Sequence, residues 1–392
     1  MTDKPGNTGA LADDTQSQLL DTVDRFIRKM VEPRAADIDE KDAFPSDLYN
    51  AAAAIGLCGI AIPSQYGGID LDLRTQLFVT ERLARSSPSF AVALSCTIGS
   101  VPPILVGGSE ALKQEILPAI ATGALKPCIA MSEASAGSDF AAITATGRRE
   151  EMSYVLDGTK TWCTNGSVGD VFSVFVKTDP TAGHAGISAF LVRKEDVGFS
   201  VIRDEDLISL RGCPTTQIEF RDCRIPRERL LGSEGGGFKL AMSAMDEDRL
   251  NTAALALGIA YRCINDAIGY ARERHAFGRP IIQHQGLQFL LAELATEFVT
   301  ARAMWLQSIH ELGKGRSRRV STLCSISKNA CCKIGMKAPI EAIQVFGAAG
   351  LSRSLPLERF MRDAKSLQIF DGTTQIHNTI IGRHLEREGI PI

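Results

Sequence analysis

Asp371 is a carboxylate that stands directly before a glycine and two threonines, in the segment Phe370-Asp371-Gly372-Thr373-Thr374. A carboxylate acts as a general base when it is held within hydrogen-bond reach of an acidic proton, in a pocket that excludes water. Asp-Gly pairs are also common in turns, because both residues tolerate the backbone angles that turns require. The residue types alone therefore allow either a catalytic base or an ordinary turn.

A second acidic cluster, Asp246-Glu247-Asp248, is followed by Arg249 at the start of a long helical pattern. Acidic side chains near a helix N-terminus are stabilised by the helix dipole, by a few tenths of a kcal/mol to about 1 kcal/mol. This cluster therefore has an explanation that requires no chemistry.

Two later segments carry groups suited to phosphate. Arg274 offers a planar fork of donors that matches phosphate oxygens. The glycines of the segment 344–350 permit close approach of the backbone to a ligand. No G-x-G-x-x-G motif follows a predicted strand, so a Rossmann domain has little support. The six histidines include no H-E-x-x-H motif or clustered ligand set, which argues against a metal site.

Hydrophobic periodicity divides the chain into three blocks that must position these residues. Residues 15–125 read as helices, after a segment 1–14 that we expect to be flexible. Residues 126–238 contain short alternating runs with Asp-Gly and Pro punctuation, which predicts a small antiparallel sheet or barrel. In residues 239–392, apolar side chains recur every three or four positions, which predicts a helix bundle. The chain is therefore predicted to be mainly α with a central β domain.

Composition agrees with a globular protein. At 392 residues and 44% hydrophobic content the chain can bury a large core. The formal net charge of -3 provides no basic stripe, so we expect no nucleic acid and no membrane partner. The apolar run 51–61 is too short to span a bilayer. The polar, acidic residues 1–18 predict neither a secretory signal nor a transit peptide, and ten cysteines without C-x-x-C spacing read as reduced core residues; together these favour a cytoplasmic protein.

Three segments together resemble signatures of the FAD-dependent acyl-CoA dehydrogenases. The segment 362–377 around Asp371 resembles the C-terminal signature, in which the base is usually Glu. The segments 131–139 and 162–166 resemble two earlier signatures, although Ala134 stands where the family usually has Pro. The similarity extends from about Thr15 to Glu388. It implies a helical bundle, a β-barrel and a second helical bundle, with FAD between the middle domain and the C-terminal bundle.

The resemblance also implies a set of cofactor contacts. It assigns a first group to the flavin ring: Met131, Ser132, Trp162, Thr164, Thr373 and Gln375. It assigns a second group to the FAD diphosphate and adenosine half: Arg274, Phe277, Gln285, Gln344, Gly347 and Gly350. In the family the segment around Arg274 reaches across a subunit interface, and the usual assembly is a homotetramer.

For the acyl-CoA substrate, the resemblance implies contacts from Ser138, Asp246, Arg249 and Gly372. It makes Asp371 the base that removes the α-proton. A minority of the family places the base at the position of Asp248, so this chain has a candidate at both sites. The resemblance further implies that the β-hydride passes to flavin N5 and that an electron-transferring flavoprotein accepts the electrons.

The short side chain of Asp371 bears on the substrate. Aspartate places its carboxylate about 1.5 Å further back than glutamate does, and uncompensated errors of that size can cost ~10²-fold in rate. Cyclohexanecarboxyl-CoA dehydrogenases resemble this chain in using Asp, which favours an alicyclic or α-branched acyl-CoA. The alternatives are a short or medium straight-chain acyl-CoA dehydrogenase, a nitroalkane oxidase-like flavoprotein, and a non-catalytic flavin-binding protein.

Overall fold

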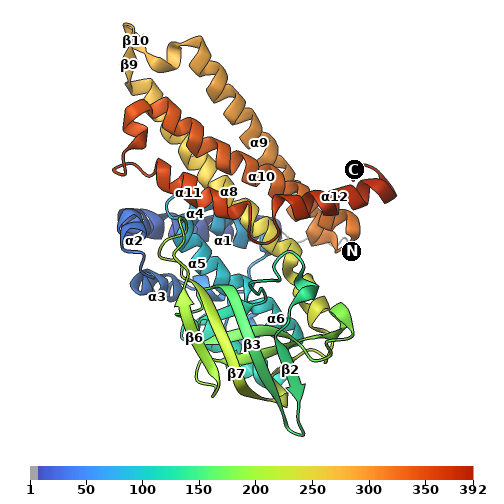
Figure 1. The fold of residues 1–392 in the computed structure, drawn as a ribbon. Coiled ribbons are helices and arrows are strands. Elements are labelled where there is room, and N and C mark those ends of the chain that lie inside the picture. Colours follow the sequence, from blue (N-terminus) through green and yellow to red (C-terminus); the bar gives the residue numbers. More distant parts are fainter. Residues whose placement is uncertain (1–7, 392) are drawn as a thin grey trace, which may run out of the picture.

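A computed structural model describes residues 8–391. Helices precede and follow a central sheet, which confirms the predicted fold class (Figure 1). Of the N-terminal segment predicted to be flexible, residues 1–7 lie outside the described residues, and the first helix already begins at Thr8.

The first part of the chain is a layer of helices, and side-chain caps mark the starts of α4, α5 and α7. Asp72 accepts a hydrogen bond from the Thr75 backbone N–H at 2.9 Å, and Ser87 similarly caps the helix that begins at Pro88. The helices are α1 (Thr8–Phe26), α2 (Ala35–Lys41), α3 (Ser46–Ala54), α4 (Leu73–Ala84), α5 (Pro88–Gly99), α6 (Val101–Gly107) and α7 (Glu110–Ala121).

The stretch Pro88–Gly107 is long and apolar enough to cross a membrane, a feature that the sequence reading overlooked. It spans α5 and α6, and 61% of it is buried inside the protein. Phe90 and Leu94 on α5 are almost completely buried against α4 and the C-terminal bundle. The stretch therefore packs as a core helix pair of this fold.

The central sheet is mixed: most strand pairs are antiparallel, as predicted, but two are parallel. Its order is β6-β7-β3-β2-β4-β5-β8, with β1 also paired to β4. Strand β4 pairs in parallel with both β1 and β2, because neither is joined to it by a hairpin. The strands are β1 (Pro127–Ala130), β2 (Thr146–Arg149), β3 (Ser153–Thr164), β4 (Val171–Lys177), β5 (Ile187–Arg193), β6 (Phe199–Asp204), β7 (Thr215–Pro226) and β8 (Leu230–Leu231).

The C-terminal part is a bundle whose long helices project away from the sheet (Figure 1). Its elements are α8 (Gly237–Glu273), α9 (Gln285–Lys314), α10 (Arg318–Phe346), α11 (Leu357–Leu367) and α12 (Thr374–Glu388); the small hairpin β9 (His275–Ala276) and β10 (Arg279–Pro280) lies at the projecting end. Helix α8 begins at Gly237, about two and a half turns before Asp246. The acidic cluster therefore lies beyond the first turn, and the helix-dipole explanation for it was wrong.

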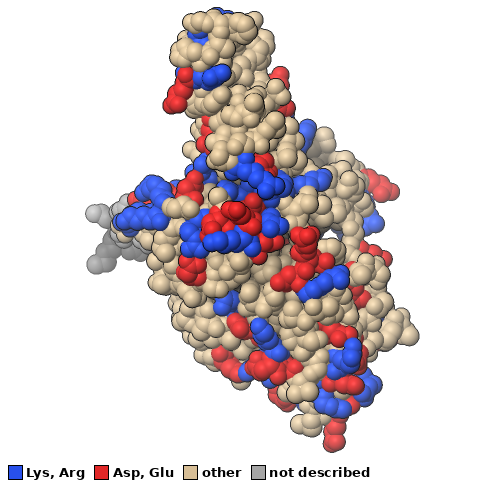
Figure 2. All heavy atoms as spheres, turned by 60° about the vertical axis from the view of Figure 1, so that its left-hand side comes forward, with Lys and Arg blue, Asp and Glu red and all other residues tan. Residues whose placement is uncertain are grey.

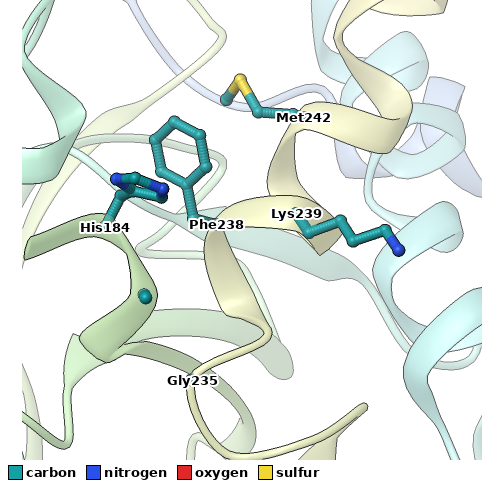
Figure 3. Close-up of a pocket in the computed structure, with 6 residues that line it drawn as sticks. His184, Gly235, Phe238, Lys239 and Met242 are labelled. Atoms are coloured by element: carbon teal, nitrogen blue, oxygen red, sulfur yellow. The ribbon is translucent and has the colours of Figure 1, made fainter. Parts of the chain in front are cut away.

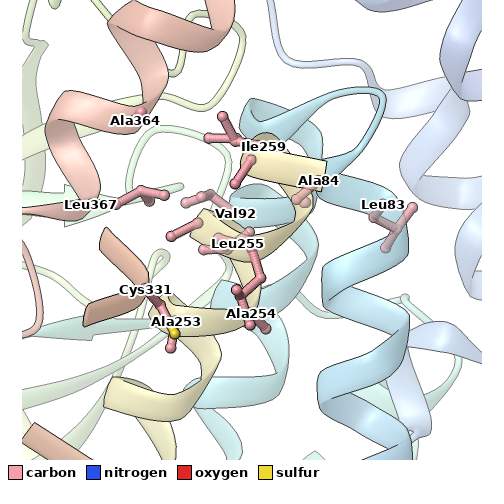
Figure 4. Packing of buried hydrophobic residues seen from close by; sticks show 14 of the residues in the cluster. Leu83, Ala84, Val92, Ala253, Ala254, Leu255, Ile259, Cys331, Ala364 and Leu367 are labelled. Carbon is pink, nitrogen blue, oxygen red and sulfur yellow. The ribbon is translucent and has the colours of Figure 1, made fainter. Parts of the chain in front are cut away.

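Helix α8 is held in the core by small residues. A Cβ atom added at Gly258 would lie 2.4 Å from the Glu81 carbonyl oxygen on α4, so only glycine allows this approach. Ala253, Ala254 and Leu255 pack among side chains of α4, α5, α10 and α11 (Figure 4). The helix that carries Asp246 and Asp248 is thus a rigid element of the molecule.

Candidate active site

Asp371 lies in the short loop between α11 and α12, in a backbone conformation that few residues adopt. Its φ is +52° and that of Gly372 is +95°. A Cβ atom at Gly372 would lie 2.9 Å from His377 Nε2, so the glycine is required both by backbone angle and by space. Thr373 then caps α12 by accepting a hydrogen bond from the Ile376 backbone N–H at 3.3 Å. The Asp-Gly-Thr sequence therefore builds a tight loop that turns Asp371 inward.

Buried groups hold Asp371 from two sides. Thr252 on α8 donates its hydroxyl to Asp371 Oδ2 at 2.7 Å. The buried ammonium of Lys328 on α10 donates to the carbonyl oxygens of Phe370 and Gly372, which flank the aspartate. The backbone N–H of Asp371 has no acceptor among the described residues. The loop therefore presents one carboxylate oxygen and one N–H group that the surrounding protein does not use.

Asp248 lies close enough to Asp371 for the two carboxyl groups to influence each other. Burial and the negative charge of Asp371 raise the pKa of Asp248 well above its usual value. Burial also raises the pKa of Asp371, but Lys328, the Thr252 hydroxyl and Arg249 oppose that rise. Of the pair, Asp371 is the group that the protein equips to ionise.

The segment at Met131 and Ser132 is anchored by a buried ion pair. Lys160 donates to the Met131 carbonyl at 3.0 Å and to Glu133 Oε1 at 2.8 Å. The Thr161 backbone N–H donates to the Ser132 carbonyl at 2.9 Å, which joins this segment to β3. Burial lowers the pKa of Lys160 to about 8, against the opposing effect of Glu133. Met131 and Ser132 are thus fixed beside Trp162, the next residue along β3.

Trp162 is a large aromatic side chain left open on the surface of β3. It is 54% exposed, and its φ of +61° falls where the pairing of β3 with β7 is irregular. Thr164 ends the same strand, and its carbonyl accepts a bond from the Cys96 thiol at 3.6 Å. A bare aromatic face next to the Ser132 segment fits a flat, partly polar ring system such as the flavin of FAD.

Cys96 lies between the end of β3, which carries Trp162, and the two aspartates. Its thiol lies on α5, and burial, Cys163, Asp371 and Asp248 together raise its pKa to about 12. A Cβ atom at Gly99, one turn further along α5, would lie 3.2 Å from Asp248 Oδ1. The end of β3, helix α5 and the Asp371 loop therefore meet at one place.

A cavity of about 390 Å³ opens at the start of α8 (Figure 3). His184, Phe238, Lys239 and Met242 line it, and Phe238 stacks on Phe140 with ring centroids 5.8 Å apart. Phe140 follows the exposed Ser138 by two residues. The predicted substrate contact Ser138 therefore lies near this cavity, on the same end of α8.

Asp246 and Arg249, the other predicted substrate contacts, are buried on α8 and paired with each other. Arg249 Nη1 donates to Asp246 Oδ1 at 2.7 Å, and the Ser321 hydroxyl donates to the same oxygen at 2.8 Å. Arg249 Nε has no hydrogen-bond partner among the described residues. These two residues lie between the cavity and the Asp371 loop, with Arg249 close enough to lower the pKa of Asp371.

The predicted contacts for the second half of FAD lie at the other end of α8. Arg274, Phe277 and Gln285 are exposed on or beside the β9-β10 hairpin, and Phe277 is 95% exposed. The 25 helical steps from Asp248 to Glu273, at about 1.5 Å each, separate this end from the aspartates by about 38 Å. One chain therefore does not bring the two predicted groups of cofactor contacts together.

The segment 344–350 belongs to the same far end, because Phe346 stacks on Tyr270 of α8 with centroids 4.2 Å apart. Gln344 and Gly347 are exposed there. Gly350 is buried, and a Cβ atom on it would lie 2.6 Å from the Ile343 carbonyl oxygen. Gly350 thus serves the packing of the helix end.

The segment after Asp371 supplies two further predicted flavin contacts. Thr373 is partly buried, and Gln375 is exposed.

Sequence reasoning missed Thr252, Lys328 and His377. Thr252 follows Asp248 by four residues, so helix spacing places them on one face and was a usable signal. Lys328 stands among small residues of α10. His377 is fully buried in α12 with no hydrogen-bond partner for either ring nitrogen among the described residues, and burial lowers its pKa to about 3.

Comparison with known families agrees with this geometry across the chain. Residues 13–124, 128–223 and 235–386 match the N-terminal, middle and C-terminal domains of acyl-CoA dehydrogenases. An acyl-CoA dehydrogenase of Bacillus subtilis is 35% identical over 95% of this chain and 98% of its own length. The cyclohex-1-ene-1-carbonyl-CoA dehydrogenase of Syntrophus aciditrophicus is 34% identical over 94% of this chain and 89% of its own.

A solved structure shows the same architecture. Butyryl-CoA dehydrogenase from Megasphaera elsdenii superposes with a TM-score of 0.92 at 30% identity, over 99% of this chain and 100% of that one. Together with the exposed Trp162 face and the inward-turned Asp371, these matches leave one assignment. The chain belongs to the acyl-CoA dehydrogenase family and is an FAD-dependent oxidoreductase of acyl-CoA thioesters.

Proposed function

We propose that Asp371 is the base that removes the α-proton during α,β-dehydrogenation of an acyl-CoA. The main support is the Asp371 loop. There one carboxylate oxygen and the backbone N–H of Asp371 have no hydrogen-bond partner among the described residues. The N–H donates to the thioester carbonyl and stabilises the negative charge that develops there as the proton leaves. Bound FAD supplies the acceptor for the hydride from the β-carbon.

Asp248 is the less suitable base. Its side chain has no hydrogen-bond partner among the described residues, and its pKa is raised more strongly by burial and by Asp371. Burial and the charge of Asp371 therefore disfavour the ionised form of Asp248. A neutral Asp248 facing the same site adds no second charge to repel a developing enolate.

The substrate we propose is an alicyclic or α-branched acyl-CoA. An aspartate base retreats from the α-carbon by about one bond length, which leaves room for a ring or branch at that carbon. Similarity to a dehydrogenase named for a cyclohexene thioester supports this choice. We propose that the thioester arm runs along the start of α8, from the cavity at Phe238 past Arg249 to Asp371.

We further propose that a second copy of this chain completes the FAD site, within a cytoplasmic homotetramer that passes electrons to an electron-transferring flavoprotein. The projecting end of the bundle is mostly uncharged in Figure 2. Phe277, Phe289, Val299 and Leu351 are all at least 60% exposed on the elements of the bundle. Exposed apolar surface of this kind suits contact with another protein chain.

An anaerobic titration of the FAD-loaded protein tests the reaction and the base. The flavin absorption is followed while cyclohexanecarboxyl-CoA, 2-methylbutyryl-CoA, butyryl-CoA, octanoyl-CoA or nitroethane is added, with wild type, Asp371→Ala and Asp248→Ala. We expect bleaching by the first two thioesters, lost in Asp371→Ala by at least ~10³-fold in rate and retained in Asp248→Ala.

Other outcomes identify the alternatives. Bleaching by straight-chain thioesters alone would contradict the substrate proposal. Loss of bleaching only in Asp248→Ala would identify Asp248 as the base. Bleaching by nitroethane alone would indicate an oxidase of nitroalkanes, and no bleaching by any compound would overturn the catalytic assignment.

A further inference from the structure

We propose that Thr252 is a positioning residue for the base: its hydroxyl fixes the Asp371 carboxylate so that Oδ1 alone meets the α-proton. The proposal rests on the function proposed above, in which Asp371 is the base. It assigns Thr252 no contact with substrate or FAD, because the residue acts through the aspartate.

The geometry of Thr252 is that of a fixed donor. The side chain is completely buried on α8, and its hydroxyl lies 2.7 Å from Asp371 Oδ2 and 3.0 Å from the Asp248 carbonyl oxygen. A hydroxyl has one hydrogen, so it donates to one of these acceptors at a time. The ionised carboxylate is the stronger acceptor and takes the hydrogen. Oδ2 is thereby held, and Oδ1 remains for the substrate.

The short side chain explains why such a donor matters here. Lys328 fixes the backbone on both sides of Asp371, so only the two side-chain torsions of the aspartate remain free. A base that starts about one bond length further back depends strongly on these torsions, since errors near 1 Å can cost ~10²-fold in rate. Thr252 lies on α8, a rigid helix of the core, and its hydrogen bond restricts these two torsions of Asp371.

The same hydroxyl serves both protonation states. In the reaction the α C–H bond breaks and an O–H bond forms on Oδ1; the released electron pair forms the new double bond as the β-hydrogen leaves with its own pair to oxidised FAD. Oδ2 then becomes a neutral carboxyl oxygen and a weaker acceptor, and the Thr252 hydrogen has the Asp248 carbonyl as a second acceptor at 3.0 Å. The Thr252 hydroxyl thus has an acceptor both before and after proton transfer.

Other titratable groups also face Asp371 and are part of any pH response. They are Asp248 and Arg249 on α8, Lys328 and the Cys332 thiol on α10, the Cys96 thiol on α5 and His377 on α12. Because the Thr252 bond favours the ionised carboxylate, its removal raises the pKa of Asp371 further. The acidic limb of a rate that requires ionised Asp371 then moves to higher pH.

The experiment compares Thr252→Val, which keeps the shape, with Thr252→Ser, which keeps the hydroxyl. Thr322→Val is the matched control: Thr322 is equally buried and makes the same bond to the fourth residue before it, to the Arg318 carbonyl at 2.9 Å, with no carboxylate partner. Anaerobic rapid mixing measures the flavin reduction rate and its substrate dependence from pH 5 to 9. Runs with α-deuterated thioester measure the isotope effect, and NMR in D₂O measures exchange of the α-proton.

We expect Thr252→Val to lower the limiting reduction rate and the exchange rate about tenfold to a hundredfold, as for loss of a hydrogen bond to a charged group. The dissociation constant for substrate stays unchanged, the isotope effect rises and the acidic limb moves to higher pH. Thr252→Ser restores most of the rate, and Thr322→Val behaves as wild type.

An unchanged rate and pH profile in Thr252→Val, while the thioester reduces the wild-type protein, would overturn this inference and leave the proposed function standing. A rate fall shared by Thr322→Val would also overturn it, and a wild type that no thioester reduces would overturn the proposed function.

Discussion

The surroundings of Asp371 and the projecting end of the bundle differ in how many of their polar groups already have partners in the same chain. Around Asp371, Thr252 and Lys328 donate to fixed acceptors, and a buried ion pair anchors the Met131 segment. At the far end of α8, Arg274 and Phe277 are exposed to solvent. Under the function proposed above, one chain supplies the groups for proton transfer, and the contacts at the far end of α8 require a second copy of the chain.

The sharpest test of this contrast removes the buried cation beside the base. Lys328→Met leaves the Phe370 and Gly372 carbonyls without their donor, and we expect the free energy of unfolding to fall by about 3 kcal/mol. The flavin reduction rate falls with it, because the loop loses its fixed position. Denaturant titration and anaerobic rapid mixing measure the two effects.

Lys333→Met is the control on the same helix, because Lys333 is exposed. It should leave both quantities unchanged. If Lys328→Met were as stable and as active as Lys333→Met, the loop would not depend on the internal network and the contrast would fail.

A variant at the open end should separate cofactor binding from catalysis. Arg274→Ala is expected to raise the FAD dissociation constant about tenfold to a hundredfold, as for loss of a charged hydrogen bond to phosphate. The stability of the FAD-free protein and the reduction rate of the fully loaded protein stay unchanged. Fluorescence titration measures the FAD dissociation constant. Arg272→Ala is the control, because Arg272 is also exposed and lies two residues earlier. Equal losses in both variants would mean that Arg274 has no special role.

The last prediction concerns the buried carboxyl group of Asp363 on α11, the helix that precedes the Asp371 loop. Asp363 is buried, accepts a hydrogen bond from the Leu210 backbone N–H at 2.6 Å, and has a pKa that burial raises to about 7. Between its ordinary value and about 7 the folded state keeps a proton that the unfolded state has released. Stability therefore falls as pH rises through this window, by at most about 1.4 kcal/mol per pH unit from this group. Asp363→Asn, which cannot titrate, should flatten the dependence of Tm on pH between 5 and 7; an unchanged slope would place the proton elsewhere.

The sequence predicted the fold class and the approximate extents of the helical and β regions, because periodicity is a local signal. Helix α8, for example, follows the spacing of Leu250, Ala254 and Leu257. The parallel pairing of β4 was missed, since strand partners are chosen by tertiary contacts. The polar support of Asp371 was missed for the same reason: Lys328 lies more than forty positions away in sequence, and nothing local to either residue indicates their contact.

The 38 Å of helix between Asp248 and the β9-β10 hairpin has a genetic consequence. If each FAD is held by the aspartate end of one copy and the hairpin end of another, two defective genes can complement each other. A copy with Asp371→Ala keeps an intact hairpin end, and a copy with Arg274→Ala keeps an intact base. Produced together, they form mixed assemblies in which one site joins both intact halves, so two alleles that are each inactive or poorly loaded restore function to one another.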